Sequence, residues 1–202
     1  MEAKEPVRIP KRLKQRPQWK GLPIPYIALI SEDGTPDFKV TDQHRRLSVM
    51  RNHWCQLCGE PLGRFCFFVG GIQAAKANQY FEPAAHLDCL IYAMRVCPFI
   101  IGKIEHADPD KIAAKHAHED IQVVKEVLPA RNPWWVIVKA SGWKAIRFVN
   151  SPQIFLKPDR IKATEPLHAE TMTYSDWRKV EQFLLSEQET KTKEVSSEET
   201  KT

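Results

Sequence analysis

Two pairs of potential metal ligands, Cys55-x2-Cys58 and His86-x2-Cys89, constrain this sequence more than any other feature. A Cys-x-x-Cys-Gly turn directs two thiolates to one point, and Gly59 can take a backbone conformation that a side chain would oppose. His86 and Cys89 lie three residues apart at the start of a predicted helix, so they project from the same face. Three thiolates and one imidazole suit tetrahedral zinc and close all four of its positions. The sequence therefore predicts a structural zinc site.

Two further cysteines leave alternatives open. Cys97, at the end of the same predicted helix, could replace His86 as the fourth ligand, and four cysteines would favour an iron–sulfur cluster. The ligands of that cluster would be Cys55, Cys58, Cys89 and Cys97. Cys66 lies in a Phe-rich predicted strand and is interpreted as a core residue. The remaining alternative is that the spacing arises by chance and that the thiols are small buried core residues.

Hydrophobic patterning predicts an α+β fold, in which the Cys-x-x-Cys-Gly knuckle, the hairpin after it and the start of the next helix form a treble-clef-like core. An added β-hairpin and amphipathic helices follow this core. We expect four segments: a basic flexible arm (1–20), a zinc-binding core (21–105), a region with a helix, the hairpin and a C-terminal helix (106–185), and a disordered tail (186–202).

Turn formers and apolar periodicity place the individual elements. Strands are expected at 25–30, 64–69 and 154–156 and helices at 41–51, 84–96 and 109–128. In the first helix, which Thr41 or Asp42 caps, the apolar face is Leu47, Met50 and Trp54. The added hairpin pairs 134–140 with 143–149 and turns at Ser141-Gly142. In the last helix, Ser175 is the cap and Trp177, Val180, Phe183 and Leu184 form the apolar face.

The net charge of +5 is concentrated in the first 20 residues, which hold seven Lys or Arg and two Glu. Pro6, Pro10 and Pro17 interrupt this segment, so we expect it to be extended. Basic side chains on such an arm gain affinity for nucleic acid by releasing counterions from the phosphates. The predicted nucleic-acid contacts are Lys11, Arg12, Lys14, Arg16 and Lys20. The alternative is a merely solvated terminus.

Four stretches of the sequence resemble an uncharacterised family of phage and bacterial proteins. They are 53–63, with the Cys-x-x-Cys-Gly knuckle; 68–71; 82–89, with Pro-x-x-His-x-x-Cys; and 92–99, with a terminal Cys-Pro. The resemblance covers roughly residues 24 to 101. It implies a zinc-binding fold and a phage-associated context, and it supplies no activity.

Several enzyme classes are disfavoured by what the sequence lacks. A nuclease of the His-Asn-His type needs a His base between the ligand pairs, yet residues 59–85 contain no His and only Glu60 and Glu82 as carboxylates. The nucleobase deaminase signature and the Walker, Gly-x-Gly-x-x-Gly and Gly-x-Ser-x-Gly motifs are also missing. Trp134, Trp135 and Trp143 could form a stacking platform, although strand alternation sends Trp134 and Trp135 to opposite faces.

We therefore expect a non-catalytic accessory protein that binds nucleic acid or a nucleic-acid-handling protein. A protein-binding inhibitor or adaptor without nucleic-acid affinity is the alternative. No apolar run approaches the roughly 20 residues needed to cross a bilayer, and no apolar stretch follows the basic start as a secretory signal would. The protein is thus expected to be cytoplasmic, with its five cysteines reduced or metal-bound.

Overall fold

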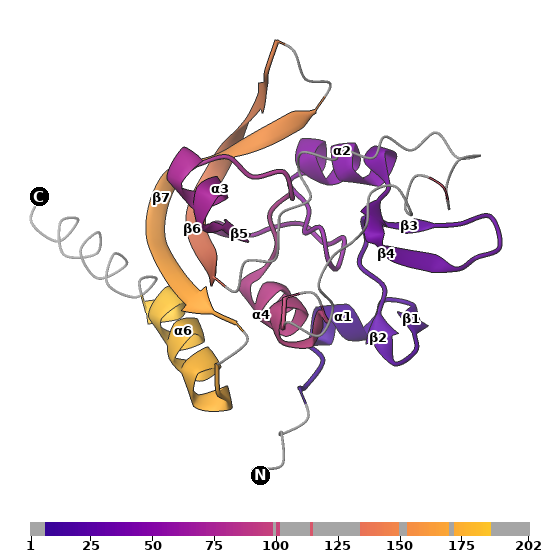
Figure 1. Ribbon diagram of the computed structural model, residues 1–202, viewed down its shortest axis with the longest axis horizontal. Coiled ribbons are helices and arrows are strands. Elements are labelled where there is room, and N and C mark those ends of the chain that lie inside the picture. The colour runs from indigo at the N-terminus through magenta and orange to yellow at the C-terminus, as the bar shows by residue number, and fades with distance from the viewer. Residues whose placement is uncertain are drawn as a thin grey trace, which may run out of the picture.

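The computed structural model describes residues 7–98, 100–101, 114, 134–149, 153–169 and 172–186 (Figure 1). Most of the expected helix at 109–128 and all but the first residue of the expected tail at 186–202 lie outside the described residues. The described part combines helices with antiparallel sheets and is thus α+β, as the sequence predicts.

The N-terminal segment is not extended along its length, and that expectation was wrong. A short helix, α1 (Lys11–Lys14), is followed by a hairpin of two-residue strands, β1 (Gln18–Trp19) and β2 (Leu22–Pro23). The helix forms because Pro10 stands before its first turn, where a proline removes no helical hydrogen bond. Leu13, on the inner side of α1, is buried in the main core. Val7 and Ile9 of the same segment pack against this core as well, so apolar side chains anchor the basic segment to the body.

A second small sheet pairs β3 (Ala28–Ile30) with β4 (Pro36–Thr41) and leads into α2 (Gln43–Asn52). The expected strand, turn and helix are confirmed, whereas β4 was not predicted. Asp42 caps α2 by accepting a hydrogen bond from the backbone N–H of Arg45. The buried face of α2 differs from the predicted one, because it consists of Arg46 and Val49 instead of the partly buried Leu47 and Met50.

The main sheet has the order β5–β6–β7 and is antiparallel throughout. Its strands are β5 (Cys66–Gly71), β6 (Trp134–Arg147) and β7 (Ile154–His168). The predicted hairpin turning at Ser141-Gly142 is wrong, since β6 runs straight through these residues and pairs with β7 along its length. Instead of a turn, the β6–β7 pairing has a shift of register between Lys139 and Ala140.

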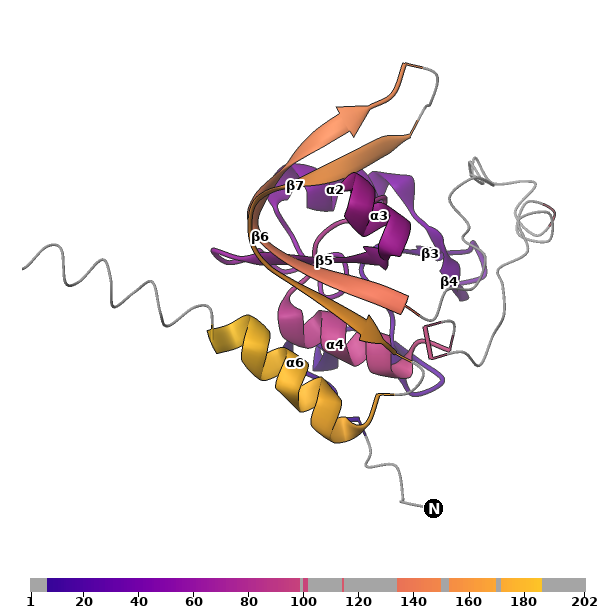
Figure 2. The ribbon, with the colours of Figure 1, turned by 60° about the vertical axis from the view of Figure 1, so that its left-hand side comes forward.

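Both faces of the sheet are covered, which alternation along the strands makes possible. Phe67 and Ile137 point into the larger core, shared with α4 (Leu87–Val96) and α6 (Tyr174–Ser186). Phe68 and Val138 point into a smaller core, beside which the alanines of α3 (Ile72–Ala77) pack. Figure 2 shows α4 and α6 on one side of the sheet and α3 on the other. Residues of both expected segments, 21–105 and 106–185, thus contribute to the same core.

The last helix buries most of the predicted apolar face. Trp177, Val180 and Leu184 are buried, whereas Phe183 is 43% exposed. Its N-terminal cap is Thr173 and not the expected Ser175, because the Thr173 hydroxyl accepts a hydrogen bond from the backbone N–H of Asp176. The Asp176 carboxylate accepts hydrogen bonds from Thr173 in return, which completes a reciprocal capping pair.

Two buried cationic side chains tie distant elements together. Lys139 on β6 is fully buried, donates from Nζ to the carbonyl of Leu184 near the C-terminus of α6 (2.7 Å), and lies over the ring of Phe65. Arg46 on α2 is 1% exposed and donates from Nη2 to the carbonyls of Phe81 (2.6 Å) and Ile154 (2.5 Å). Arg46 thereby joins α2 to the first residue of β7.

Replacing Arg46 by Met should destabilise the fold strongly. Two buried carbonyls would lose their charged donor, so we expect the free energy of unfolding to fall by about 3 kcal/mol in urea denaturation. Arg51→Met is the matched control, because Arg51 is exposed on the same helix and should change stability by less than about 0.5 kcal/mol. Equal losses in the two variants would show that Arg46 contributes nothing beyond an ordinary surface arginine.

Candidate metal centre

The first half of the site is a tight turn at the end of α2. The backbone N–H of Cys55 donates to the carbonyl of Glu60, and the N–H of Gly59 donates to the carbonyl of Cys55, both at 2.8 Å. Gly59 has a φ of +80°, and a Cβ at this position would lie 2.5 Å from Cδ2 of Tyr26. Positive φ and close approach both require glycine here. The turn therefore holds Cys55 and Cys58 in a fixed relation.

The second half lies at the start of α4. The helix begins at Leu87, three residues later than predicted, so His86 is its N-cap with an extended backbone and Cys89 lies in its first turn. His86 therefore projects from the approach to the helix instead of from its face. The two side chains still converge, because the N-cap residue directly adjoins the first turn.

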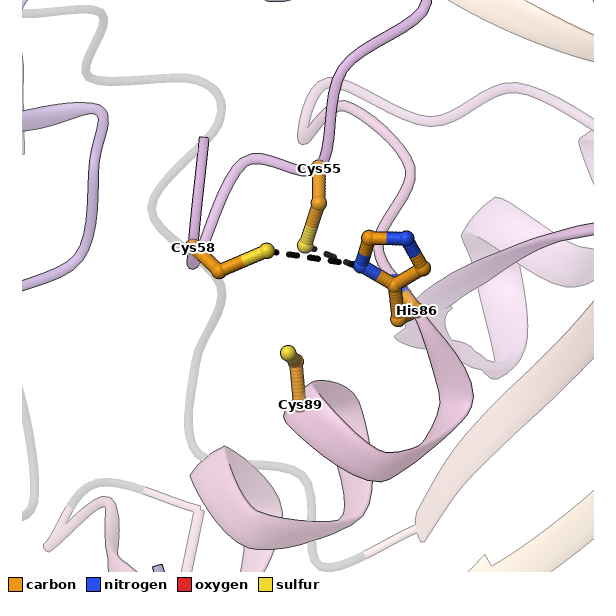
Figure 3. A group of neighbouring side chains, drawn as sticks. All are labelled: Cys55, Cys58, His86 and Cys89. Atoms are coloured by element: carbon orange, nitrogen blue, oxygen red, sulfur yellow. Dashed lines mark hydrogen bonds between the residues drawn. The ribbon is translucent and has the colours of Figure 1, made fainter. Parts of the chain in front are cut away.

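The four predicted ligands meet in one place. Sγ of Cys55, Cys58 and Cys89 and a ring nitrogen of His86 all lie within 4.8 Å of one another. Figure 3 shows the four side chains pointing toward a common centre. Sγ of Cys58 lies 3.4 Å from Nδ1 of His86, whose backbone N–H donates to Sγ of Cys55 at 3.4 Å. These four residues lie close enough to hold a metal ion.

Gln56, between the two cysteines of the turn, fastens the two halves together. Its backbone N–H donates to the carbonyl of Ala84 (3.1 Å), and its buried side-chain amide donates to the carbonyl of Pro83. One residue further on, Ala85 exchanges two backbone hydrogen bonds with Phe67 of β5. The approach to His86 is thus held by the turn on one side and by the main sheet on the other.

The orientation of His86 favours metal binding through Nδ1. Nε2 lies 3.0 Å from the carbonyl oxygen of Pro61, which can only accept a hydrogen bond. Nε2 must therefore carry a proton, and in the neutral ring this leaves the lone pair on Nδ1, the nitrogen that faces Cys58. Backbone carbonyls that hold the far nitrogen of a histidine in this way are common around metal sites.

The protonation of the cluster is unequal. Burial alone would raise the pKa of Cys55, but hydrogen bonds from Cys58 and Cys89 and from backbone N–H groups hold that pKa well below its ordinary value. The pKa of Cys89 is raised, because its thiol donates to Cys55 and Cys58 and is buried. For His86, burial lowers the pKa, but the contacts with Cys58 and Pro61 outweigh it and raise the pKa. A cation at the centre would replace the shared protons.

Arg12 from the N-terminal segment bridges both halves of the site. Its Nε lies 3.2 Å from a carboxylate oxygen of Glu60 beside the turn, and its Nη1 lies 3.3 Å from the carboxylate of Asp88 in α4. These pairs are more than one third exposed, so each contributes little by itself. The guanidinium also places a positive charge near the thiols of Cys58 and Cys89. Three thiolates around a divalent cation would carry a net negative charge that Arg12 offsets.

The five basic residues predicted to bind nucleic acid do not act alike. Arg12 is engaged at the metal centre, and Arg16 donates from Nε to the carbonyl of Ile24 while its guanidinium lies over the ring of Tyr26. Lys11, Lys14 and Lys20 are exposed. The segment thus uses two of its predicted contact residues to hold its own fold.

An open groove of about 690 Å³ lies beside His86. Charged residues of both signs line it, among them Arg12, Arg64, Asp88 and Glu181, together with the apolar Phe65 and Leu185. The groove leaves the imidazole partly accessible, whereas Cys55 and Cys89 are fully buried.

The two remaining cysteines lie apart from the cluster. Cys97 follows the last turn of α4, at the opposite end of the helix from His86, and is not among the converging ligands. The ligand set expected for an iron–sulfur cluster is therefore not assembled among the described residues. Cys66 is a core residue, as predicted: it is 3% exposed and donates to the carbonyl of Ala140, and burial raises the pKa of its thiol to about 12.

No protein-family model, curated protein or solved structure matches the chain. The resemblance to a phage and bacterial family therefore stays a prediction. Among the described residues, none of the helices has the length and apolar character that a membrane crossing requires.

Sequence reasoning predicted the four side chains that converge but missed the residues that support them. Gln56 donates to the carbonyl of Pro83, the carbonyl of Pro61 faces Nε2 of His86, and Arg12 pairs with the carboxylate of Asp88. These partners lie far apart in the sequence. The position of Gln56 between two candidate ligands was the one available signal, and residue type alone did not distinguish it from a solvated glutamine.

Replacing Gly59 by Ala should damage the turn more than the same change at a comparable glycine. Gly34 has a nearly equal φ of +81° but nothing within 4 Å of an added Cβ, so Gly34→Ala tests the backbone strain alone. We expect Gly34→Ala to lower the free energy of unfolding by about 1 kcal/mol. Gly59→Ala should cost about 2 kcal/mol more, because the methyl group would overlap the ring of Tyr26.

Urea denaturation of both variants measures this difference. Equal losses at the two positions would show that Tyr26 moves aside freely and that the turn is not tightly packed.

Proposed function

We propose that this protein is a non-catalytic nucleic-acid-binding accessory protein whose fold is held by one zinc ion. The observation that carries the zinc assignment is the convergence of Cys55, Cys58, His86 and Cys89 on one point. A tetrahedral zinc site with metal–sulfur bonds of about 2.3 Å has ligand sulfurs about 3.8 Å apart. Because the four ligand atoms already lie within 4.8 Å of one another, small movements would close them around the ion.

The donor set supports a structural role for the metal. Three soft thiolates and an imidazole match the preference of zinc and would occupy its four tetrahedral positions, which leaves none for a substrate. The ion would supply stability by replacing shared protons among buried thiols with four metal–ligand bonds. Among the described residues, no second group of three or more potential ligands converges as these four do.

A treble-clef-like core is part of the proposal. The support is a Cys-x-x-Cys-Gly turn, a following strand that returns to the approach of the ligand helix through Phe67 and Ala85, and two ligands at the start of that helix. The departure from a simple treble clef is that β5 pairs along its length with the distant β6. The phage-associated context rests on the sequence resemblance alone.

Zinc should be present at a single ion per chain and should depend on Cys89 but not on Cys97. Mass spectrometry that reads zinc and iron together on the untagged protein would measure this. Cys89→Ser should lose the metal and unfold at lower temperature, whereas Cys97→Ser is the matched control and should keep it. Zinc affinity should fall as the pH is lowered, because protons compete for the thiolates and for His86. Iron that disappears in Cys97→Ser would contradict the zinc assignment.

The nucleic-acid part of the proposal is supported by the net charge of +5 and by exposed lysines. We expect the zinc-loaded full chain to bind a labelled oligonucleotide at low salt, with an affinity that falls linearly against the logarithm of salt concentration. Fluorescence anisotropy measures both quantities. Absence of binding at low salt, together with a stoichiometric protein partner in purified complexes, would favour the inhibitor or adaptor alternative instead.

A further inference from the structure

Strands β6 and β7 continue as a two-stranded ribbon beyond the end of β5. The pairing of β5 ends at Ala140, whereas β6 and β7 remain paired from Gly142 with Asp159 to Arg147 with Ile154. Figures 1 and 2 show this extension reaching past the rest of the sheet, on the opposite side of the molecule from α4 and α6. We call residues 141–149 and 153–162 the distal ribbon.

One face of the distal ribbon packs on the body. Trp143 contacts the rings of His53 and Phe68, with ring centroids 4.2 Å and 5.9 Å apart, and Leu156 is fully buried. At the outer edge, Leu156 exchanges two backbone hydrogen bonds with Tyr80. These contacts fix the ribbon. We call the opposite face the outer face; there Phe155 contacts the ring of Phe81, with ring centroids 6.0 Å apart.

The outer face carries two lysines directly opposite each other. Lys144 on β6 pairs with Lys157 on β7, and both side chains are exposed. Like charges in directly opposite positions destabilise a sheet. Neither lysine forms an ion pair with a carboxylate of the described residues. No carboxylate in the described part of the chain offsets this repulsion, and a bound anion would relieve it.

The surroundings of this pair are basic as well. Arg160 and Lys162 are exposed further along β7, Arg147 is exposed on the opposite face of the ribbon by strand alternation, and Asp159 is the single carboxylate in the sequence between residues 141 and 162. Arg160 donates from Nη2 to the carbonyl of Ser141, which holds its guanidinium over the ribbon. Five basic side chains against one acidic one make the distal ribbon strongly positive.

Aromatic side chains lie next to the positive charge. Phe148, at the end of β6, is 45% exposed, and its ring centroid lies 5.6 Å from that of Phe155. Phe155 follows on β7 two residues before Lys157 and on the same face. A positive surface with an exposed aromatic ring is the combination by which proteins hold unpaired bases and the phosphates between them.

We propose that the outer face of the distal ribbon binds single-stranded nucleic acid, with phosphates at Lys144 and Lys157 and a base stacked on Phe148. An exposed aromatic ring beside basic side chains favours a single strand over a duplex, because the faces of unpaired bases are free to stack on the ring whereas those of a duplex are covered by neighbouring base pairs. This inference rests on the proposed nucleic-acid binding and assigns it to a surface other than the N-terminal segment.

The test compares two double variants of the full zinc-loaded chain that each lose two positive charges. The ribbon variant is Lys144→Gln with Lys157→Gln, and the matched control is Lys11→Gln with Lys14→Gln, whose lysines are exposed on α1. The probes are a labelled oligothymidine of about 20 nucleotides and a duplex of the same length. Anisotropy titrations over a range of salt concentrations give the affinity and its salt dependence.

The ribbon variant should bind the single strand at least about tenfold more weakly, and its salt slope should fall by about 1.4, whereas the control should change little. Phe148→Ala should weaken binding by about fivefold or more with an unchanged slope. The ribbon variant should also unfold at the same or a higher urea concentration, because it removes a like-charge pair. A loss of binding through misfolding is thereby excluded.

The possible failures are distinguishable. If the wild-type chain binds neither probe, the proposed function falls and this inference falls with it. If it binds but only the α1 control weakens, nucleic-acid binding stands and the ribbon assignment is overturned. If the duplex binds more tightly than the single strand, the assignment to unpaired bases is overturned.

Discussion

Much of the structure depends on one constraint, which is that three buried thiols and one imidazole lie within 4.8 Å of one another. In water, solvent would form hydrogen bonds with these groups. In a dry interior, their interactions are supplied only by shared protons or by a bound cation. The turn at Cys55, the approach to α4 and the side chain of Arg12 all converge on this group, and each depends on the others for its position. The centre therefore lies where α1, the turn after α2 and the start of α4 meet.

The larger architecture uses buried cations in a different way. Lys139 and Arg46 are almost wholly removed from water, and the hydrogen-bond acceptors described for them are backbone carbonyls. Leu184 lies in the last turn of α6, Ile154 is the first residue of β7, and Phe81 lies in the segment after α3. The two side chains therefore donate to backbone carbonyls at or beside the ends of elements. They also connect α6 and α2 to the main sheet.

The parts of the structure that depend on local sequence were predictable, and those that depend on distant partners were not. The spacing of Cys55, Cys58, His86 and Cys89 sufficed to predict that these side chains converge, because a knuckle and the start of a helix have fixed local geometry. The cap at Asp42 and the end of α4 before Pro98 also follow from adjacent residues. By contrast, the pairing of β6 with β7 overrides the local turn signal of Ser141-Gly142. Lys139 and Arg46 are buried because of carbonyls 45 and 108 positions away in the sequence.

The same difference in sequence distance bears on the order in which the molecule assembles. The two halves of the metal centre are joined by contacts between residues 28 and 31 positions apart, whereas paired residues of β5 and β6 are 64 to 74 positions apart. Closing the shorter loop costs less chain entropy, and the knuckle and α4 are complete before the ribosome has made β6. We therefore expect the knuckle and α4 to come together while β5 is not yet paired with β6. An ion bound between them would then hold β5 in place, through the pairing of Phe67 with Ala85, until β6 has been made.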